Sequence, residues 1–79
     1  MNPREHEVLK RVGRNLAAER ARQGLSQDDV ATRMGLQMQQ YSKLERGEHD
    51  SGLTKFVAAA WALDITWDQL LDGVDAHRP

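Results

Sequence analysis

Residues 27–46 carry the pattern that most restricts how this chain can fold, two short groups of apolar residues on either side of one glycine. Ala31 precedes Gly35, and Tyr41 and Leu44 follow it. Because Tyr41 and Leu44 are three residues apart, they share one face of a helix. Gly35 can end the preceding helix, since glycine adopts the left-handed conformation at little steric cost. The pattern predicts a helix-turn-helix, in which the polar face of the second helix would read DNA.

Apolar residues at helical spacing, together with capping residues and glycines, predict helices along the rest of the chain. The expected helices run from Asn2-Pro3 to about Gln23, from the cap Ser26 to Gly35, from about Gln37 to Arg46, from a cap at Asp50 or Ser51 to Leu63, and from the cap Thr66 to Gly73. The tail from Val74 to Pro79 is expected to be frayed. Residues 1–79 are therefore expected to form one compact all-α domain of five helices.

Composition excludes several classes of protein. The 79 residues allow one small domain, without cysteine for a disulfide or a thiolate site. His6, His49 and His77 follow no ligand spacing, so we expect neither a metal nor a cofactor. No nucleophile–base pair or phosphate-binding loop is visible, which argues against an enzyme. The chain also lacks a signal peptide and an apolar run near the ~20 residues of a membrane span, so the expected location is the cytoplasm.

Charge is divided unevenly along the chain, although the formal net charge is only −1. Residues 1–47 contain nine Lys or Arg and six Asp or Glu, a balance of +3, whereas residues 48–79 contain two and six, a balance of −4. Taken alone, this division is explained equally well by ordinary surface solvation. Together with the helix-turn-helix pattern, it favours a basic half that meets DNA and an acidic half that points away.

A set of residues spread over positions 8–73 extends the pattern to nearly the whole chain. The set comprises Arg20, Gly24-Leu25-Ser26-Gln27, Val30-Ala31, Gly35, Ser42, Leu44-Glu45, Gly47, Leu63-Asp64-Ile65 and Leu70-Leu71-Asp72-Gly73. In these positions the chain resembles the phage repressor and Cro-like helix-turn-helix regulators, the XRE family. The resemblance implies a lambda-repressor-like DNA-binding domain of five helices, with a structural ion pair between Arg20 and Glu45.

The resemblance also implies a role for the polar positions of the motif. Gln27 would bind a DNA phosphate and brace the reading helix. The first residues of that helix, Met38, Gln39 and Gln40, would contact bases, with Lys43 one turn further on. A glutamine amide fits the donor and acceptor of adenine, and lysine suits guanine. Met38 would meet a thymine methyl or pack on Leu36. Outside such a motif, these side chains would be interpreted as a solvated helix surface.

Two departures from the family pattern concern contacts to DNA phosphate. Gln37 stands where relatives often have a Ser, Thr or Asp cap, so we expect Gln37 to contact phosphate instead. The loop Glu48-His49-Asp50 is acidic where many relatives carry basic residues or a proline, and it repels phosphate. The remaining phosphate contacts are expected from backbone N–H groups at helix starts and from Arg46, Arg14 and Arg22.

The function implied is that of a transcriptional regulator that binds a roughly palindromic operator on double-stranded DNA as a homodimer. The apolar candidates for the dimer interface are Trp61, Trp67 and Val74. We expect Trp67 to lie in the core and leave Trp61 open between core and interface. The alternative is an antitoxin or other interaction module with autoregulatory DNA binding. The sequence leaves open the operator, the choice between activation and repression, and any protein partner such as a toxin or polymerase.

Overall fold

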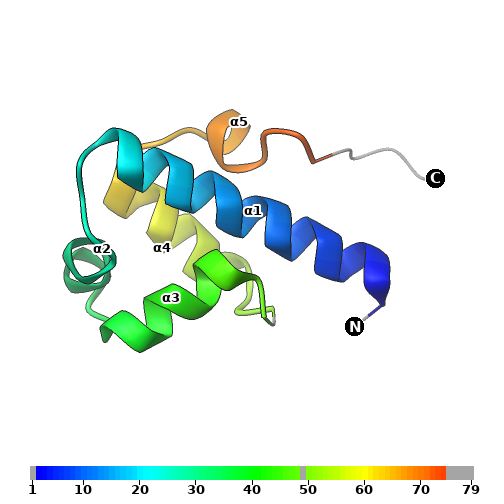
Figure 1. Ribbon diagram of the computed structural model, residues 1–79, viewed down its shortest axis with the longest axis horizontal. Coiled ribbons are helices and arrows are strands. Elements are labelled where there is room, and N and C mark those ends of the chain that lie inside the picture. Colours follow the sequence, from blue (N-terminus) through cyan, green and yellow to red (C-terminus); the bar gives the residue numbers. More distant parts are fainter. Residues whose placement is uncertain (1, 49, 75–79) are drawn as a thin grey trace.

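The computed structural model describes residues 2–48 and 50–74, which form five α-helices and no strand (Figure 1). The helices are α1 (Pro3–Arg22), α2 (Gln27–Met34), α3 (Met38–Arg46), α4 (Leu53–Leu63) and α5 (Trp67–Leu70). The predicted all-α fold is therefore confirmed for these residues, and the helices lie close to their expected bounds except that α5 ends earlier. His49, His77 and the predicted frayed segment 75–79 lie outside the described residues.

Reciprocal hydrogen bonds between the cap and the third helical residue begin α1, α2 and α5. In α2, the N–H of Asp29 donates to Oγ of Ser26 at 3.0 Å, and the N–H of Ser26 donates to the Asp29 carboxylate at 2.8 Å. Such capping boxes satisfy donors that the first turn of a helix leaves unpaired. The predicted caps Ser26 and Thr66 are confirmed.

The start of α4 differs from the prediction, because neither Asp50 nor Ser51 caps it. Gly52 is the N-cap residue, and no side-chain hydrogen bond caps the helix. Oδ1 of Asp50 instead accepts a hydrogen bond from the N–H of Gly52 at 2.9 Å. The carboxylate thus closes a local turn ahead of the helix, a conformation that aspartate readily stabilises.

Side chains from α2 and from the residue after α1 bind the end of α4. Nε2 of Gln23 donates to the carbonyl oxygen of Leu63 at 2.6 Å, and Nη1 of Arg33 donates to that of Ala62 at 2.9 Å. The last carbonyl groups of a helix have no partner within the helix, so these bonds satisfy them. They also tie the first two helices to α4.

The core lies where α1 meets the other helices. In Figure 1, α1 extends along the molecule, and it contacts α3, α4 and α5, whereas α2 contacts α3 and α4. The apolar stripe predicted for α1 is buried, and so is the corner of the helix-turn-helix. The buried apolar cluster consists of Val12, Leu16, Val30, Ala31, Tyr41, Leu44, Ala59, Ala60, Leu63 and Leu70.

The prediction that Trp67 lies in the core is wrong, because 49% of this residue is exposed. α5 has only four residues, and its inward position is taken by Leu70, which is 1% exposed. Trp61, left open by the sequence, lies outside the core with 77% exposure. Val74, expected in a frayed tail, is half-buried against the core, and its N–H donates to the carbonyl oxygen of Leu71 at 2.9 Å.

Candidate nucleic-acid interface

The corner between α2 and α3 is closed by backbone hydrogen bonds around Gly35. Gly35 lies in the left-handed region at φ +71°, and the N–H of Leu36 donates back to the carbonyl oxygen of Ala31 at 2.8 Å. Ala31 and Tyr41 are fully buried on the two sides of the corner. This packing fixes which face of α3 turns inward and leaves the opposite face to solvent.

The outward face of α3 carries polar side chains at helical spacing. Gln39, Gln40, Lys43 and Arg46 are all exposed, and separations of three or four residues place them along one side of the helix. Met38 begins the helix with 44% exposure, and Gln37 is the exposed N-cap residue. In Figure 1, α3 lies along one edge of the molecule, with α1 on its other side.

Gln39 and Gln40 differ in how free their amides are. Oε1 of Gln40 accepts a hydrogen bond from the N–H of Gln37 at 2.9 Å, so this acceptor stabilises the first turn of α3. Gln40 is left with its N–H₂ group to donate outward. Within residues 2–48 and 50–74, Gln39 has no such bond, so it can offer both a donor and an acceptor.

A buried ion pair joins α1 to α3. Nε of Arg20 donates to Oε2 of Glu45 at 2.7 Å, and Nη2 donates to Oε1 at 3.1 Å. The Glu45 side chain is only 6% exposed and that of Arg20 is 20% exposed. Bidentate pairing of this kind is stronger and more directional than a single hydrogen bond. The two residues that the family resemblance pairs are thus in direct contact.

Gln27 and Leu25 extend this ion pair toward α2. Nε2 of Gln27 donates to Oε1 of Glu45 at 2.9 Å, and Nη1 of Arg20 donates to the carbonyl oxygen of Leu25 at 3.0 Å. Glu45 therefore collects hydrogen bonds from α1 and from the first residue of α2. These contacts join the start of α2 to the end of α3, as bracing of α3 by Gln27 would require.

The surroundings of Glu45 favour its ionised form. Burial acts to raise the pKa of Glu45, but hydrogen bonds led by those from Arg20 outweigh it, and the pKa lies below its usual value. The Tyr41 hydroxyl nearby is buried and has no hydrogen-bond partner among the described residues. Burial, with a smaller effect of the Glu45 carboxylate, raises the pKa of Tyr41, so this hydroxyl stays neutral.

The lowered pKa of Glu45 predicts an acid-sensitive contribution to stability. In the unfolded chain, Glu45 takes up a proton near pH 4.3, before it does so in the folded protein. The stabilisation is therefore complete above that pH and is lost as the pH falls through the folded-state pKa. We expect the free energy of unfolding of the wild type to exceed that of Glu45→Gln at pH 7, and the difference to narrow by pH 3. Urea denaturation measures both free energies. If their difference is the same at pH 7 and pH 3, a lowered pKa of Glu45 is contradicted.

A close approach between α1 and α3 occurs at Gly13, which is buried in the middle of α1. A Cβ atom on Gly13 would lie 2.7 Å from the carbonyl oxygen of Leu44 and closer still to that of Glu45. Such separations are well inside van der Waals contact, so only glycine fits. Sequence reasoning missed this position, although a lone glycine within a helical pattern is a signal for such a contact.

Arg46, an expected phosphate contact, is held by side chains of its own segment. Its Nε donates to Oε2 of Glu48 at 2.7 Å and its Nη2 to Oε1 at 3.3 Å. Its Nη1 donates to Oγ of Ser42. Of the other cations considered for phosphate, Arg22 pairs with Glu19 at 2.9 Å, and Arg14 is exposed on α1. The structure thus leaves Lys43 as the exposed cation on α3 that has no ion pair within the described residues.

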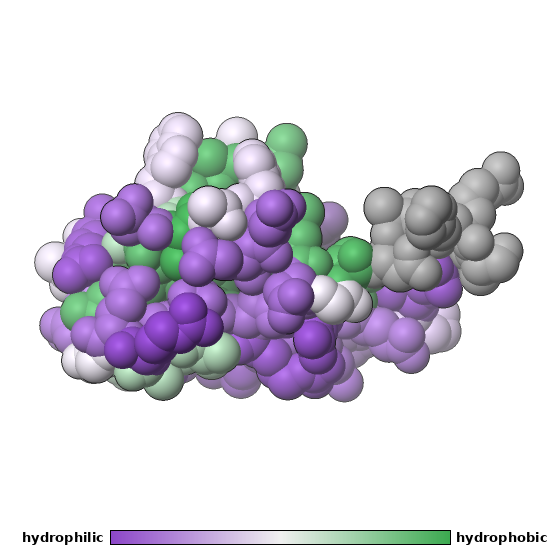
Figure 2. All heavy atoms as spheres, turned by 90° about the horizontal axis from the view of Figure 1, so that it is seen from above, coloured by the Kyte–Doolittle hydropathy of each residue, from purple (hydrophilic) through white to green (hydrophobic). Residues whose placement is uncertain are grey.

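Apolar side chains are exposed on α4, on α5 and at the residue after α5. Leu53 is 70% exposed, Leu71 is 41% exposed, and Trp61 and Trp67 accompany them. Two shallow hollows meet at Trp67, one lined also by Leu53, Phe56 and Leu71, and the other by Val57 and Trp61. Figure 2 shows hydrophobic groups emerging between hydrophilic side chains on the face seen from above. We call Leu53, Trp61, Trp67 and Leu71 the α4–α5 apolar surface.

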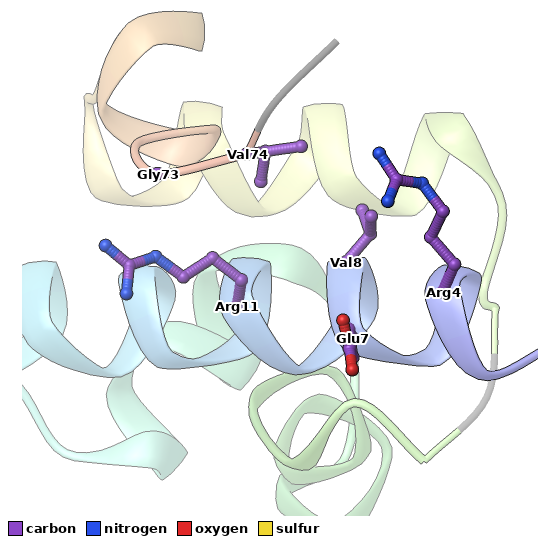
Figure 3. Close-up of a pocket in the computed structure, with 6 residues that line it drawn as sticks. All are labelled: Arg4, Glu7, Val8, Arg11, Gly73 and Val74. Atoms are coloured by element: carbon purple, nitrogen blue, oxygen red, sulfur yellow. The ribbon is translucent and has the colours of Figure 1, made fainter. Parts of the chain in front are cut away.

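A further hollow lies between the first half of α1 and the segment after α5 (Figure 3). Arg4, Val8 and Arg11 line it from α1, opposite Gly73 and Val74. Nε of Arg11 donates to the carbonyl oxygen of Asp72 at 2.9 Å, and Nδ2 of Asn15 donates to the same oxygen at 2.8 Å. These bonds fasten the segment after α5 to α1.

Neither a metal centre nor a membrane span is indicated by the part of the chain that the structure describes. Within residues 2–48 and 50–74, no three His, Cys, Asp or Glu side chains come together as a metal site would require. None of the helices there is both long and apolar enough to cross a membrane.

The chain is similar to known proteins over most of its length. Residues 16–70 match the helix-turn-helix family model. The chain is 33% identical over 69 residues to the HTH-type transcriptional regulator y4dJ of Sinorhizobium fredii, covering 87% of this chain and 90% of that protein. Its structure is similar to that of the restriction-modification controller protein C.AhdI from Aeromonas hydrophila, with a TM-score of 0.75 and 32% identity, covering 82% of this chain and 94% of that chain.

Proposed function

Because the chain belongs to the helix-turn-helix family of XRE-type transcriptional regulators, which bind DNA, we propose that it binds a roughly palindromic operator as a homodimer. The reading helix would be α3, lying in the major groove. The observation that supports this best is the exposed polar face of α3, presented by a helix whose other side is fixed by Glu45 and Gly13. A rigid support matters because base contacts need precise placement.

The exposed side chains divide by the chemistry they can offer. Gln39 has both amide groups available for the N6 and N7 edge of adenine, and Lys43 suits the O6 and N7 edge of guanine. Met38 and Gln40 lie at the same end of α3 and would add a thymine methyl contact and a donor. Phosphate contacts would come from Gln27, Gln37 and Arg46, with the N–H groups at the helix starts.

The α4–α5 apolar surface is the proposed contact between the two copies. An exposed tryptophan such as Trp61 is costly in water and typical of the centre of protein interfaces. The surface lies on helices other than α2 and α3, so two copies could pair through it while both reading helices remain exposed. A two-fold pairing would place the reading helices in successive major grooves, about 34 Å apart.

The similarity to C.AhdI favours a controller role in a restriction-modification setting over the phage and toxin–antitoxin settings. The toxin–antitoxin alternative uses the same apolar surface, with a partner protein in place of the second copy. The oligomeric state of the purified protein separates these two proposals, because only the first requires self-association.

Gln39→Ala tests base reading. We expect this variant to bind duplex DNA flanking its own gene about tenfold or more weakly, because a bidentate contact to a base contributes roughly 1–3 kcal/mol. Binding to a scrambled duplex should be unchanged, because sequence-independent affinity comes from contacts to phosphate. Fluorescence anisotropy titrations at two salt concentrations measure both. Lys55→Ala, on α4, serves as the control and should bind both duplexes like the wild type. Equal losses on the two duplexes would contradict base reading by Gln39.

Trp61→Ser tests the dimer. Removing a central aromatic side chain from an interface commonly costs 2 kcal/mol or more, so we expect a roughly 30-fold weaker dimer. Light scattering and sedimentation measure the shift from dimer toward monomer. Met38→Ser removes an exposed apolar side chain of α3, outside this surface, and should leave the dimer intact. A wild-type protein that remains monomeric at high concentration would exclude the homodimer and favour a partner protein.

A further inference from the structure

The segment after α3 folds back on the reading helix. Gly47 ends α3 in the left-handed region at φ +62°, and this conformation turns the chain so that Glu48 meets Arg46. Gly47 is also pressed against α1, since a Cβ atom there would lie 2.7 Å from the backbone of Leu9 and Lys10. The position from which Glu48 reaches Arg46 is therefore set by the backbone.

The contact uses the guanidinium group in the way that a phosphate would. Two of its nitrogens face the Glu48 carboxylate and a third faces Ser42, so three sides of the group are engaged. A carboxylate and a phosphate compete for the same bidentate arrangement of donors. Arg46 lies three residues beyond Lys43, on the exposed face of α3. One of the two cations on that face is thus neutralised within the protein.

We propose that Glu48 acts as an electrostatic brake on DNA binding by holding Arg46 in an intramolecular ion pair that a DNA phosphate must displace. The inference rests on the proposed function, in which α3 enters the groove. When Arg46 turns to phosphate, its ion pair with Glu48 is broken, and the negative charge of Glu48 repels the DNA backbone. Phosphate contacts carry no sequence information, so the brake lowers the sequence-independent part of the affinity.

The test compares Glu48→Gln with three matched variants on a random-sequence duplex of 20 base pairs. Asp50→Asn removes one negative charge from the same loop but keeps an oxygen for the N–H of Gly52. Arg46→Gln removes the cation, and Arg46→Gln/Glu48→Gln shows whether Glu48 acts through it. Fluorescence anisotropy gives the dissociation constant from 50 to 300 mM NaCl, and circular dichroism melts check that every variant is folded.

We expect Glu48→Gln to bind about threefold to tenfold more tightly than the wild type at 50 mM salt, because one exposed ion pair and one repulsion are removed. The slope of log affinity against log salt should steepen by up to about 0.9, the value for one added phosphate contact. When Arg46 is already Gln, only the lost repulsion remains, so the gain should fall below about twofold, and Asp50→Asn should likewise gain less than about twofold.

Three outcomes would overturn the brake while leaving the proposed function intact. These are wild-type affinity in Glu48→Gln, an undiminished gain in the Arg46→Gln background, and an equal gain in Asp50→Asn. If neither the wild type nor any folded variant binds duplex DNA at 50 mM salt, the proposed function itself is wrong, and so is the proposed role of Glu48. Tight binding by Glu48→Gln beside weak binding by the wild type supports both.

Discussion

Replacing Glu45 with alanine is expected to destabilise the fold by about 3 kcal/mol, because it leaves the charge of Arg20, whose side chain is only 20% exposed, without its carboxylate. The same change removes the acceptor for Gln27, so α1, α2 and α3 all lose a contact. A domain of this size has a total stability on the order of 4–12 kcal/mol, so the loss is a large fraction of it. Urea denaturation at pH 7 measures the effect.

Glu48→Ala is the matched control for this prediction. It also removes a glutamate paired with an arginine, but the side chains of Arg46 and Glu48 are 52% and 47% exposed. An exposed pair contributes little to stability, because water solvates both charges when they separate. We therefore expect the denaturation midpoint of Glu48→Ala to stay close to that of the wild type. Similar shifts in the two variants would show that burial of the Arg20–Glu45 pair is unimportant.

Gly13→Ala is expected to have the second large effect on stability. It should destabilise the fold, although helix propensity alone favours alanine over glycine. In an exposed helix, this change would stabilise by about 1 kcal/mol. Here the added Cβ would collide with the carbonyl oxygens of Leu44 and Glu45, and backbone atoms cannot move aside as a flexible side chain can. We expect a net loss of about 2–3 kcal/mol, the cost of overpacking a tight contact. Thermal and urea denaturation measure it.

Ala18→Gly gives the comparison within the same helix. Ala18 is exposed on α1, so this change should cost only the propensity difference of about 1 kcal/mol. The two reciprocal changes should therefore both destabilise, with Gly13→Ala the more severe. A more stable Gly13→Ala variant would mean that α1 and α3 do not approach as closely as the structure shows.

Much of the fold could be predicted because it depends on local signals. Ser26 and Thr66 cap helices through bonds to residues three positions away, and Gly35 ends a helix through its own backbone conformation. Asp50 shows the limit of this reasoning, since a carboxylate near a helix start has more than one local partner. In this chain it closes a turn with Gly52 instead of capping α4.

Features that depend on tertiary contacts could not be predicted in the same way. The spacing of α5 places Trp67 and Leu70 on the same side of the helix, and only the packing of the core decides that Leu70 is buried while Trp67 stays half exposed. The contact of Gly13 with the end of α3 joins residues about thirty positions apart, and periodicity carries no information about it. The pairing of Arg46 with Glu48 depends on how Gly47 turns the chain.

The central claim is that the exposed face of α3 meets DNA, and a titration of ¹⁵N-labelled protein tests it most directly. Duplex DNA flanking its own gene would be added while amide chemical shifts are followed residue by residue. We expect the largest shifts at residues 37–43 and at Gln27, with small shifts at the exposed positions of α4 and α5. Large shifts confined to α4 and α5, with residues 37–43 unmoved, would contradict the account.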